Sequence, residues 1–527
     1  MRKHHRFLLG MLVLGALLSA ALLYAFRAAT TIIAHYNPVP RPPKIHPDYT
    51  GTAIPPNIAP LNFIVRESAA RYCVRIHAKE GPPIQIQSRK PKIHIPIHPW
   101  KKLLAANRGR PLHLDVYTQD KTGTWKKFET ITNTITNDEI DDYLVYRKIK
   151  LSVMWKDMGV YQRNLQNYDE SIILHNSSFD SGCVNCHSFL NNSSSNMLTQ
   201  VRSPRYGTPM LMAQNAEVSA LNTRTKFTPG KVGFTAWHPN GRVIAFSINS
   251  FEMFFHTAAI EVRDVFSHAS DLALYLIDSN KVLSTSSITR PDRLETFPEF
   301  SRDGRYLYFC SAPQLPVERY REVRCDLMRI NYDPKTQKWG QLETVLSADK
   351  VQGSITQPRF SPDGRLLLFN VSEYSTFPTH QAQSDLYIME TETGQFRKLP
   401  ISSNRCDAWH GFSSNGRWIV FSSKRLTGRF ARPFFSHIDE TGKAYKPFLL
   451  PQKDPTFYDS LLQVYNIPEL ISQPVPIKPK QLTTGILAYE QAPHADIVTG
   501  ATPGLPPVPP HRPQPPSTYD QPWLQRE

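Results

Sequence analysis

One short pattern recurs four times in the middle of this sequence and decides the fold. It reads AWHPNGRVIAFS (236–247), EFSRDGRYLYFC (299–310), RFSPDGRLLLFN (359–370) and GFSSNGRWIVFS (411–422). Each copy has an aromatic residue, two spacers, Asp-Gly-Arg or Asn-Gly-Arg, and then an apolar run. Because Asp-Gly and Asn-Gly tolerate the positive φ of a tight turn, each copy predicts a β-hairpin.

The spacing of the hairpins indicates a β-propeller. The turn glycines Gly241, Gly304, Gly364 and Gly416 lie 63, 60 and 52 residues apart, a period that fits several strands per unit. The runs DLALYLID, CDLMRINYD and DLYIMETETGQFRKL supply outer strands, and residues 197–223 supply a further blade. We expect a propeller of five to seven blades over residues 196–475. The alternative is an irregular two-sheet β-domain with repeated hairpins.

Composition excludes several classes of protein. A chain of 527 residues with 40% hydrophobic residues has enough apolar content for two or three folded units, which rules out wholesale disorder. The formal net charge is +16, but no run of Lys and Arg interleaved with aromatics accompanies it. We therefore expect no nucleic-acid partner.

The N-terminus indicates export. Three basic residues precede the uncharged stretch FLLGMLVLGALLSAALLYAF (7–26), whose 20 residues can cross a bilayer as a helix. We interpret residues 1–27 as an uncleaved membrane anchor, with a cleaved signal as the alternative. Positive charge ahead of the span places the body outside the inner membrane, in the bacterial periplasm.

Other boundaries follow from shifts in composition. Residues 28–60 are rich in proline and predict an extended stalk. Residues 61–146 hold short β-type runs between Gly, Pro and Asn, which favours a small β-sandwich, immunoglobulin-like in our interpretation. Residues 147–195 carry a separate haem motif segment, and residues 476–527 form a proline-rich tail. The expected fold class is therefore mainly β.

The motif CVNCH (183–187) carries the chemistry. The thiols of Cys183 and Cys186 have the spacing that joins two vinyl groups of one haem, and His187 follows as an iron ligand, so one covalent haem c is predicted. Zinc is an alternative, but no second Cys/His pair at finger spacing accompanies the motif. A thioredoxin-like redox pair and an ordinary disulfide are further alternatives. The remaining cysteines are interpreted as structural: Cys73, Cys310, Cys325 and Cys406.

The stretches around these motifs show a family resemblance. YQRNLQNYDESIILHN, GCVNCHSF, IEVRDVFSHASDLALYLID and SSNGRWIVFSSKR resemble the TolB-like propeller proteins of bacterial cell envelopes that carry a c-type haem motif. The resemblance covers roughly residues 140–470. It implies a propeller with a covalent haem and supplies no substrate.

The sixth iron ligand is predicted less directly. Met197 lies ten residues after His187, and His256 lies in a segment that matches the family pattern, so these two are the metal-ligand candidates. His175, Met210, Met212 and an open site remain alternatives. His238 is interpreted as structural at its hairpin, and His410 as a packed or solvent-facing histidine.

Three functions are compatible with this sequence. In the first hypothesis the haem passes single electrons to or from an envelope redox partner that docks on the propeller. In the second, the propeller binds another envelope component, and the haem is a structural staple or a sensor. The third is a propeller oxidoreductase. A peptidase would need a G-x-S-x-G elbow, which is absent, and no catalytic residue is assigned.

Overall fold

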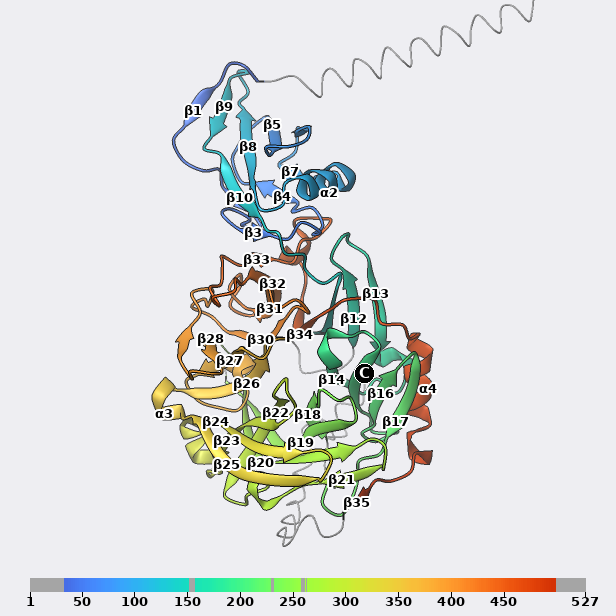
Figure 1. The fold of residues 1–527 in the computed structure, drawn as a ribbon. Helices are drawn as coiled ribbons and strands as arrows, with labels where there is room; N and C mark the ends of the chain where they lie inside the picture. Colours follow the sequence, from blue (N-terminus) through green and yellow to red (C-terminus); the bar gives the residue numbers. More distant parts are fainter. Residues whose placement is uncertain (1–32, 151–156, 229–231, 257–260, 262, 499–527) are drawn as a thin grey trace, which may run out of the picture. The chain divides into compact units, whose positions relative to one another are not determined.

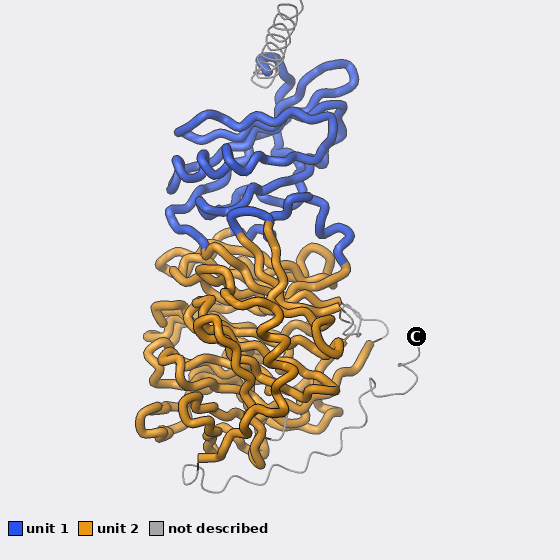
Figure 2. Tube along the Cα trace, turned by 90° about the vertical axis from the view of Figure 1, so that its right-hand side faces the viewer, with its two compact units in different colours: residues 1–140, 165–168, 446–461 blue, residues 141–164, 169–445, 462–527 orange. Residues whose placement is uncertain are grey.

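The computed structural model describes residues 33–150, 157–228, 232–256, 261 and 263–498. The chain divides into two compact units, coloured separately in Figure 2. Unit 1 comprises residues 1–140, 165–168 and 446–461, and unit 2 comprises residues 141–164, 169–445 and 462–527. The predicted anchor, residues 1–27, lies outside the described residues. Within the described ranges, no helix is long and apolar enough to span a membrane.

Unit 1 is built from two sheets and one helix. The larger sheet is centred on β8, which pairs with β5 along one side and with β9 and β10 along the other. Its strands are β1 (Asn37–Val39), β3 (Ala53–Ile54), β5 (Arg71–His77), β6 (Ile84–Ser88), β8 (Pro111–Gln119), β9 (Trp125–Phe128) and β10 (Ile131–Ile135). The smaller sheet has β2 (Ile45–His46), β4 (Phe63–Val65) and β7 (Lys92–Ile93), and the helix is α2 (Ile97–Ala106). Strand β33 (Phe448–Leu449) also falls within this unit.

Two sheets agree with the predicted sandwich, but the predicted stalk is wrong. Residues 37–54 supply β1, β2 and β3, and Ile54 and Ile58 are fully buried. The indole Nε1 of Trp100 donates to the carbonyl of Ile58 at 3.0 Å, which ties this segment to α2. Prolines stiffen the segment, but its apolar residues pack into the core of unit 1. The parallel pairs β1–β9 and β3–β10 and the helix α2 differ from a purely antiparallel immunoglobulin pattern.

Unit 2 is a β-propeller of six sheets, antiparallel except for the pair β21–β35 (Figure 1). The first sheet contains β11 (Tyr143–Lys150), β12 (Met158–Asn164), β13 (Glu170–His175) and β34 (Gln463–Ile471), and the second contains β14 (Cys183–Phe189), β15 (Asn196–Arg202), β16 (Met210–Gln214) and β17 (Glu217–Leu221). The third contains β18 (Val232–Trp237), β19 (Val243–Phe255), β20 (Arg263–Leu276), β21 (Lys281–Leu283) and β35 (Asp496–Ile497), and the fourth contains β22 (Arg293–Phe300), β23 (Tyr306–Pro313), β24 (Asp326–Asp333) and β25 (Lys338–Leu346). The fifth contains β26 (Ser354–Phe360), β27 (Leu366–Ser372), β28 (Ser384–Glu390) and β29 (Phe396–Lys398). The sixth contains β30 (Asp407–Phe412), β31 (Trp418–Ser423) and β32 (Arg432–His437).

The propeller closes by pairing its last blade strand with its first. Strand β34 lies antiparallel to β11, so one sheet combines strands more than 300 residues apart in sequence. The inner strands β14, β18, β22, β26, β30 and β34 each contact the next, and β14 contacts β34. The number of blades therefore lies within the predicted range of five to seven.

The repeated hairpin turns form as the sequence predicts. Gly241, Gly304, Gly364 and Gly416 have φ between 70° and 75°, the left-handed region that glycine enters without steric cost. In the third copy, Asp363 Oδ1 accepts the backbone N–H of Arg365 at 3.1 Å, which fixes the turn locally.

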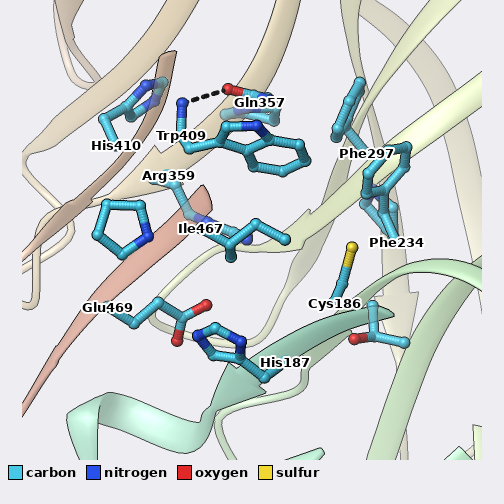
Figure 3. A pocket seen from close by; sticks show the side chains of 14 residues that line it. Cys186, His187, Phe234, Phe297, Gln357, Arg359, Trp409, His410, Ile467 and Glu469 are labelled. Carbon is cyan, nitrogen blue, oxygen red and sulfur yellow. Dashed lines mark hydrogen bonds between the residues drawn. The ribbon is translucent and has the colours of Figure 1, made fainter. Parts of the chain in front are cut away.

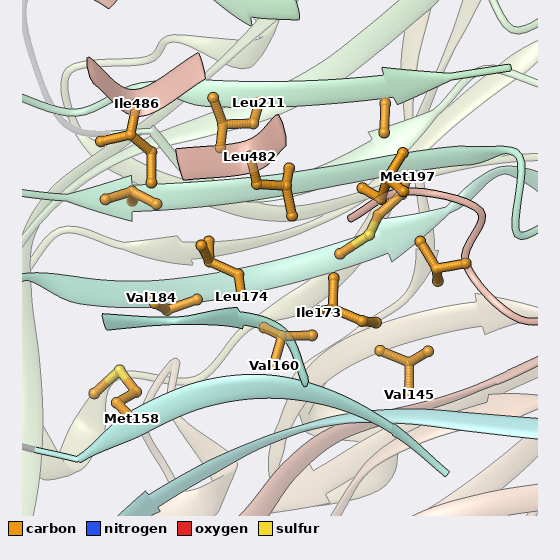
Figure 4. Close-up of a cluster of buried hydrophobic side chains, with 14 of the residues drawn as sticks. Val145, Met158, Val160, Ile173, Leu174, Val184, Met197, Leu211, Leu482 and Ile486 are labelled. Atoms are coloured by element: carbon orange, nitrogen blue, oxygen red, sulfur yellow. The ribbon is translucent and has the colours of Figure 1, made fainter. Parts of the chain in front are cut away.

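The propeller extends beyond the predicted residues 196–475 at both ends. Strands β11 to β13 belong to its first sheet, and the haem motif itself forms β14, so residues 147–195 are not a separate segment. After β34 the chain forms α4 (Pro479–Leu487) and then β35, which pairs parallel with β21. Leu482 and Ile486 of α4 join the apolar cluster shown in Figure 4. The predicted proline-rich tail therefore begins later than residue 476, and residues 499–527 lie outside the described part.

Candidate axial site

The six inner strands converge on two adjoining cavities, which we call the axial channel. One cavity, of about 30 Å³, is lined by Cys186 and His187 of β14 together with residues of β18, β22, β26, β30 and β34. The other, of about 80 Å³, begins at Ser188 and includes Glu299, Arg359 and Glu469. The candidate site is thus built by all six blades.

A bulge at the same place in every inner strand determines which residues line the channel. The pairing register shifts once in each of these strands, between Val184 and His187 in β14 and between Thr356 and Arg359 in β26. In four of the bulges a residue other than glycine has positive φ, namely Phe297, Gln357, Trp409 and Ile467. The first paired residues after the bulges are His187, Thr235, Glu299, Arg359, Gly411 and Glu469. His187 therefore occupies the repeat position that holds Arg359 in a sister blade.

The two thiols of the motif are buried and are not bonded to each other. Cys183 lies in an apolar cluster between the first two sheets, with its Sγ 3.8 Å from Met158 Sδ. Cys186 lines the smaller cavity, next to His187 on the same strand (Figure 3). Burial raises the pKa of the Cys186 thiol, although nearby guanidinium groups oppose this shift. Both cysteines are therefore available as thiols.

His187 is buried and has no well-formed side-chain hydrogen bond. Its residue is 2% exposed, and neither ring nitrogen has a partner within good hydrogen-bond geometry. Burial lowers the pKa of His187 to about 3, the positive charge of Arg147 adds to this effect, and the nearby backbone of Ile467 and Val145 partly offsets it. The imidazole is therefore neutral at physiological pH, which is the form that ligates metals.

Neither predicted sixth ligand lines the axial channel. Met197 lies on β15 opposite Phe189, within the apolar cluster that also contains Cys183 (Figure 4). His256 follows β19, with its side chain 30% exposed and its Nε2 3.7 Å from Asp264 Oδ2. Of the alternatives, His175 has its Nε2 3.2 Å from Asp157 Oδ1. Met210 and Met212 belong to a different apolar cluster. The sixth ligand stays a prediction.

The structure places a second histidine in the channel, His410, which the sequence had indicated only as packed or solvent-facing. His410 of β30 lines both cavities and is 5% exposed, and neither of its ring nitrogens has a hydrogen-bond partner. Burial lowers the pKa of His410 to about 3. Aligning Trp409-His410 with Gln357-Pro358 in the repeat would have placed His410 at the bulge. By contrast, His238 is structural as predicted, since its Nε2 lies 3.0 Å from the carbonyl oxygen of Gly304.

Charged side chains occupy the larger cavity. Arg359 Nη1 donates to Glu299 Oε2 at 2.7 Å. Glu469 accepts the backbone N–H of Phe189 at 3.2 Å, and burial raises its pKa to about 7 even though Arg359 opposes this shift. These three residues stand at equivalent repeat positions on β26, β22 and β34, so their proximity follows from the propeller itself.

Aromatic side chains fill the other end of the channel. The rings of Phe234 and Phe297 stack with centroids 3.9 Å apart, and Trp409 lies 5.8 Å from Phe234. The backbone N–H of Trp409 donates to Gln357 Oε1 at 2.8 Å (Figure 3). These side chains leave room for about two water molecules beside Cys186 and His187.

The donor set of the motif was tested against metals and against haem. Among the described residues, no three of His, Cys, Asp and Glu lie close enough together to hold a metal ion. Two unbonded thiols and a buried imidazole are the donor types that a covalent haem uses, but Cys183 lies in the apolar cluster while Cys186 and His187 line the channel. The aromatic side chains would have to move to admit a macrocycle, because the cavity of about 30 Å³ is too small for one.

Comparison with known proteins gives structural matches only. No family model and no curated protein matches the chain. TolB from Acinetobacter baumannii matches with 11% identity and a TM-score of 0.41, over 68% of this chain and 79% of that one. The propeller domain of the Trilobed protease from Pyrococcus furiosus matches with 12% identity and a TM-score of 0.31, over 65% and 95% of the two chains. The propeller assignment rests on the six sheets described above, and TolB and peptidase propellers are among the structures similar to it.

Proposed function

We propose that this chain is a c-type haem protein of the bacterial cell envelope, in which the propeller holds the haem at its axis and presents it to a redox partner. The observation that carries the proposal is His187, a buried neutral imidazole without a well-formed hydrogen bond, on the same strand as two free thiols. When bound, haem c supplies a one-electron iron couple.

Each motif residue has a distinct role in this proposal. Cys183 and Cys186 hold the cofactor covalently, and His187 is the proximal ligand. The bulge in β14 lies between the two thiols, which have different surroundings. Cys183 faces the apolar cluster, while Cys186 lines the channel. Covalent attachment of the haem therefore uses one thiol that is fixed in the core, Cys183, and one that reaches the cavity, Cys186.

The residues around His187 favour metal binding by its imidazole. Burial holds His187 neutral, so no proton has to leave before the imidazole binds a metal. Phe234, Phe297 and Trp409 supply an apolar wall on one side of the channel. A membrane anchor and a periplasmic location remain part of the proposal, because residues 1–27 lie outside the described part.

Covalent haem is tested by expression of the full chain in a host with haem c maturation. We expect haem staining on a denaturing gel, and we expect Cys183→Ser with Cys186→Ser to abolish it. The matched control is Cys73→Ser with Cys406→Ser, two buried cysteines outside the motif, which should stain normally. A wild-type protein that is folded and colourless would contradict the proposal.

A second candidate is a binding propeller without electron transfer. It is favoured by the larger cavity, where Glu299, Arg359 and Glu469 provide charges for a bound segment of another envelope component. Reduced-minus-oxidised spectra with a soluble cytochrome decide between the two functions. Electron exchange that stops in His187→Ala supports the relay, whereas partner binding that depends on Arg359 and not on His187 supports the binding module.

A further inference from the structure

Strand β35 leaves a free backbone edge on the third sheet of the propeller. It pairs parallel with β21 and is the outermost strand of that sheet (Figure 1). Asp496 and Val498 donate their backbone N–H groups toward β21, to the carbonyls of Asn280 and Val282, at 3.0 Å each. Because successive N–H groups of a strand point in opposite directions, the N–H of Ile497 faces away from β21.

A groove opens along this edge. The N–H of Ala495 donates to the carbonyl of Asn222 at 2.9 Å, and Asn222 forms an isolated parallel bridge with His494. Beyond this bridge the two stretches of chain line opposite parts of one groove, residues 224–226 on one part and residues 494–497 on the other. Its volume is about 900 Å³, compared with about 80 Å³ for the larger cavity of the axial channel. An extended backbone therefore has room beside Ile497.

The groove carries an excess of positive charge. Of the eight described residues that line it, Arg224, Lys226 and Lys281 are exposed and permanently positive, whereas Asp496 is acidic. Lys281 lies opposite Asp496 in the pairing of β21 with β35, and His494 adds charge when it is protonated. A ligand that is complementary to this groove is therefore negatively charged.

We propose that this groove binds an extended acidic segment of a partner protein, which adds to the third sheet as a further strand beside β35. In such a complex a backbone carbonyl of the segment accepts the N–H of Ile497. Alternate side chains of a strand point the same way, so carboxylates at every second residue of the segment reach Arg224 and Lys226. An anionic membrane surface matches the charge of the groove but offers no backbone to the strand edge. This inference does not depend on the haem.

The test of charge uses the full chain and a short fluorescent peptide in which valine and glutamate alternate, with fluorescence anisotropy as the readout. Lys226→Glu combined with Lys281→Glu should weaken binding about tenfold or more, because two attractions become repulsions. Lys335→Glu combined with Lys338→Glu changes the net charge equally at exposed positions near the start of β25, and it should leave binding unchanged. Equal weakening in both double variants would overturn the site, because the peptide would then respond to net charge alone.

The test of strand addition compares two changes at one residue. Ile497→Pro removes the N–H at an edge position, where proline is tolerated, and should weaken binding about threefold or more relative to Ile497→Ala, which keeps the N–H. A peptide methylated on its backbone nitrogens should bind the wild-type chain less tightly than the unmodified peptide, and this comparison needs no variant of the protein. Equal affinities in both comparisons would overturn strand addition.

Vesicles that contain phosphatidylglycerol serve as a probe of the membrane alternative. Vesicle binding that is lost in the Lys226→Glu, Lys281→Glu protein, together with no binding of the peptide, would overturn the peptide assignment in favour of a membrane surface. Neither outcome bears on the proposed haem function, which haem staining tests separately.

Discussion

The inner strands β14 and β26 share one geometry and differ in how their polar groups are satisfied. In β26 the residue after the bulge is Arg359, which pairs with Glu299 from the neighbouring blade. In β14 the equivalent residue is His187, and neither of its ring nitrogens has a partner. One copy of the repeat has its polar group paired within the fold, whereas the imidazole of the other has no well-formed hydrogen bond. The predictions below test this difference in the Cys183→Ser, Cys186→Ser protein, where no haem is attached.

The largest effect is expected in β26. Arg359→Leu leaves Glu299 and Glu469 in the channel without their cation, and breaking a buried ion pair on one side costs about 3–5 kcal/mol. Urea unfolding should therefore show a large loss of stability. Arg365→Leu is the control, because Arg365 is exposed and pairs with Asp363 in its own turn, and it should leave the stability nearly unchanged. Equal losses in both variants would show that Arg359 is not structural.

A pH dependence is expected at the third channel position, Glu469 of β34. Its pKa is raised from 4.5 to about 7 by burial, so the folded state keeps a proton that the unfolded chain releases. The free energy of unfolding should therefore fall as pH rises from about 4.5 to 7, by up to about 3 kcal/mol. Glu469→Gln should remove this part of the slope, as measured by urea unfolding at several pH values. The groups facing Glu469 are Arg359, Glu299 and His187, and the imidazole stays neutral across this range.

A slope unchanged in Glu469→Gln would show that another carboxyl is responsible. Glu295 is the main alternative, because burial raises its pKa to about 8. The fall in the free energy of unfolding that Glu295 causes should continue up to about pH 8 in the Glu469→Gln variant, and it should disappear in Glu295→Gln.

The two strands also differ in the turn that follows them. After β26 the turn uses Gly364 with φ of 75°, while after β14 it uses Asn192 with φ of 58°. Asn192 Nδ2 donates to the carbonyls of Phe412 and Leu470 at 2.9 Å and 2.8 Å, so Asn192→Ala should cost about 2 kcal/mol. Gly364→Ala loses no hydrogen bond and should cost about 1 kcal/mol through its positive φ. Thermal unfolding of both variants measures this order, and the reverse order would show that backbone strain outweighs the amide contacts of Asn192.

This comparison also shows what the sequence could and could not predict. The hairpins around Gly241, Gly304, Gly364 and Gly416 were predictable because Asp-Gly and Asn-Gly specify a turn locally. The blade of β14 to β17 was predicted only in part, from residues 197–223, and its inner strand with CVNCH was assigned to a separate segment because the turn after it uses Asn191 and Asn192 and lacks the glycine signal. The pairing of β34 with β11 was missed because strand partners distant in sequence leave no local pattern.

The candidate site was predictable in its chemistry and not in its surroundings. Cys183, Cys186 and His187 were identified by spacing alone. The position of His410 in the channel and of Arg147 beside the motif followed only from the arrangement of the blades, since an isolated His or Arg in a sequence has no distinguishing context. Met197 was proposed from its distance along the chain and His256 from a match to the family pattern, and neither criterion says where a side chain lies in a propeller.

The smallest effect is expected at His187 itself. A leucine has nearly the volume of a histidine, and replacing a buried polar group that has no partner by an apolar one is close to neutral or stabilising. His187→Leu should therefore change the free energy of unfolding by less than about 1 kcal/mol in the protein without haem, although Arg359→Leu at the equivalent position is severely destabilising. Urea unfolding of the two variants side by side measures the difference. If His187→Leu cost as much as Arg359→Leu, the imidazole would have a partner within the fold, and the argument that its nitrogens await a metal would be wrong. A near-neutral substitution that nevertheless altered the absorption spectrum of the haem-loaded protein would assign His187 to the cofactor rather than to the stability of the propeller.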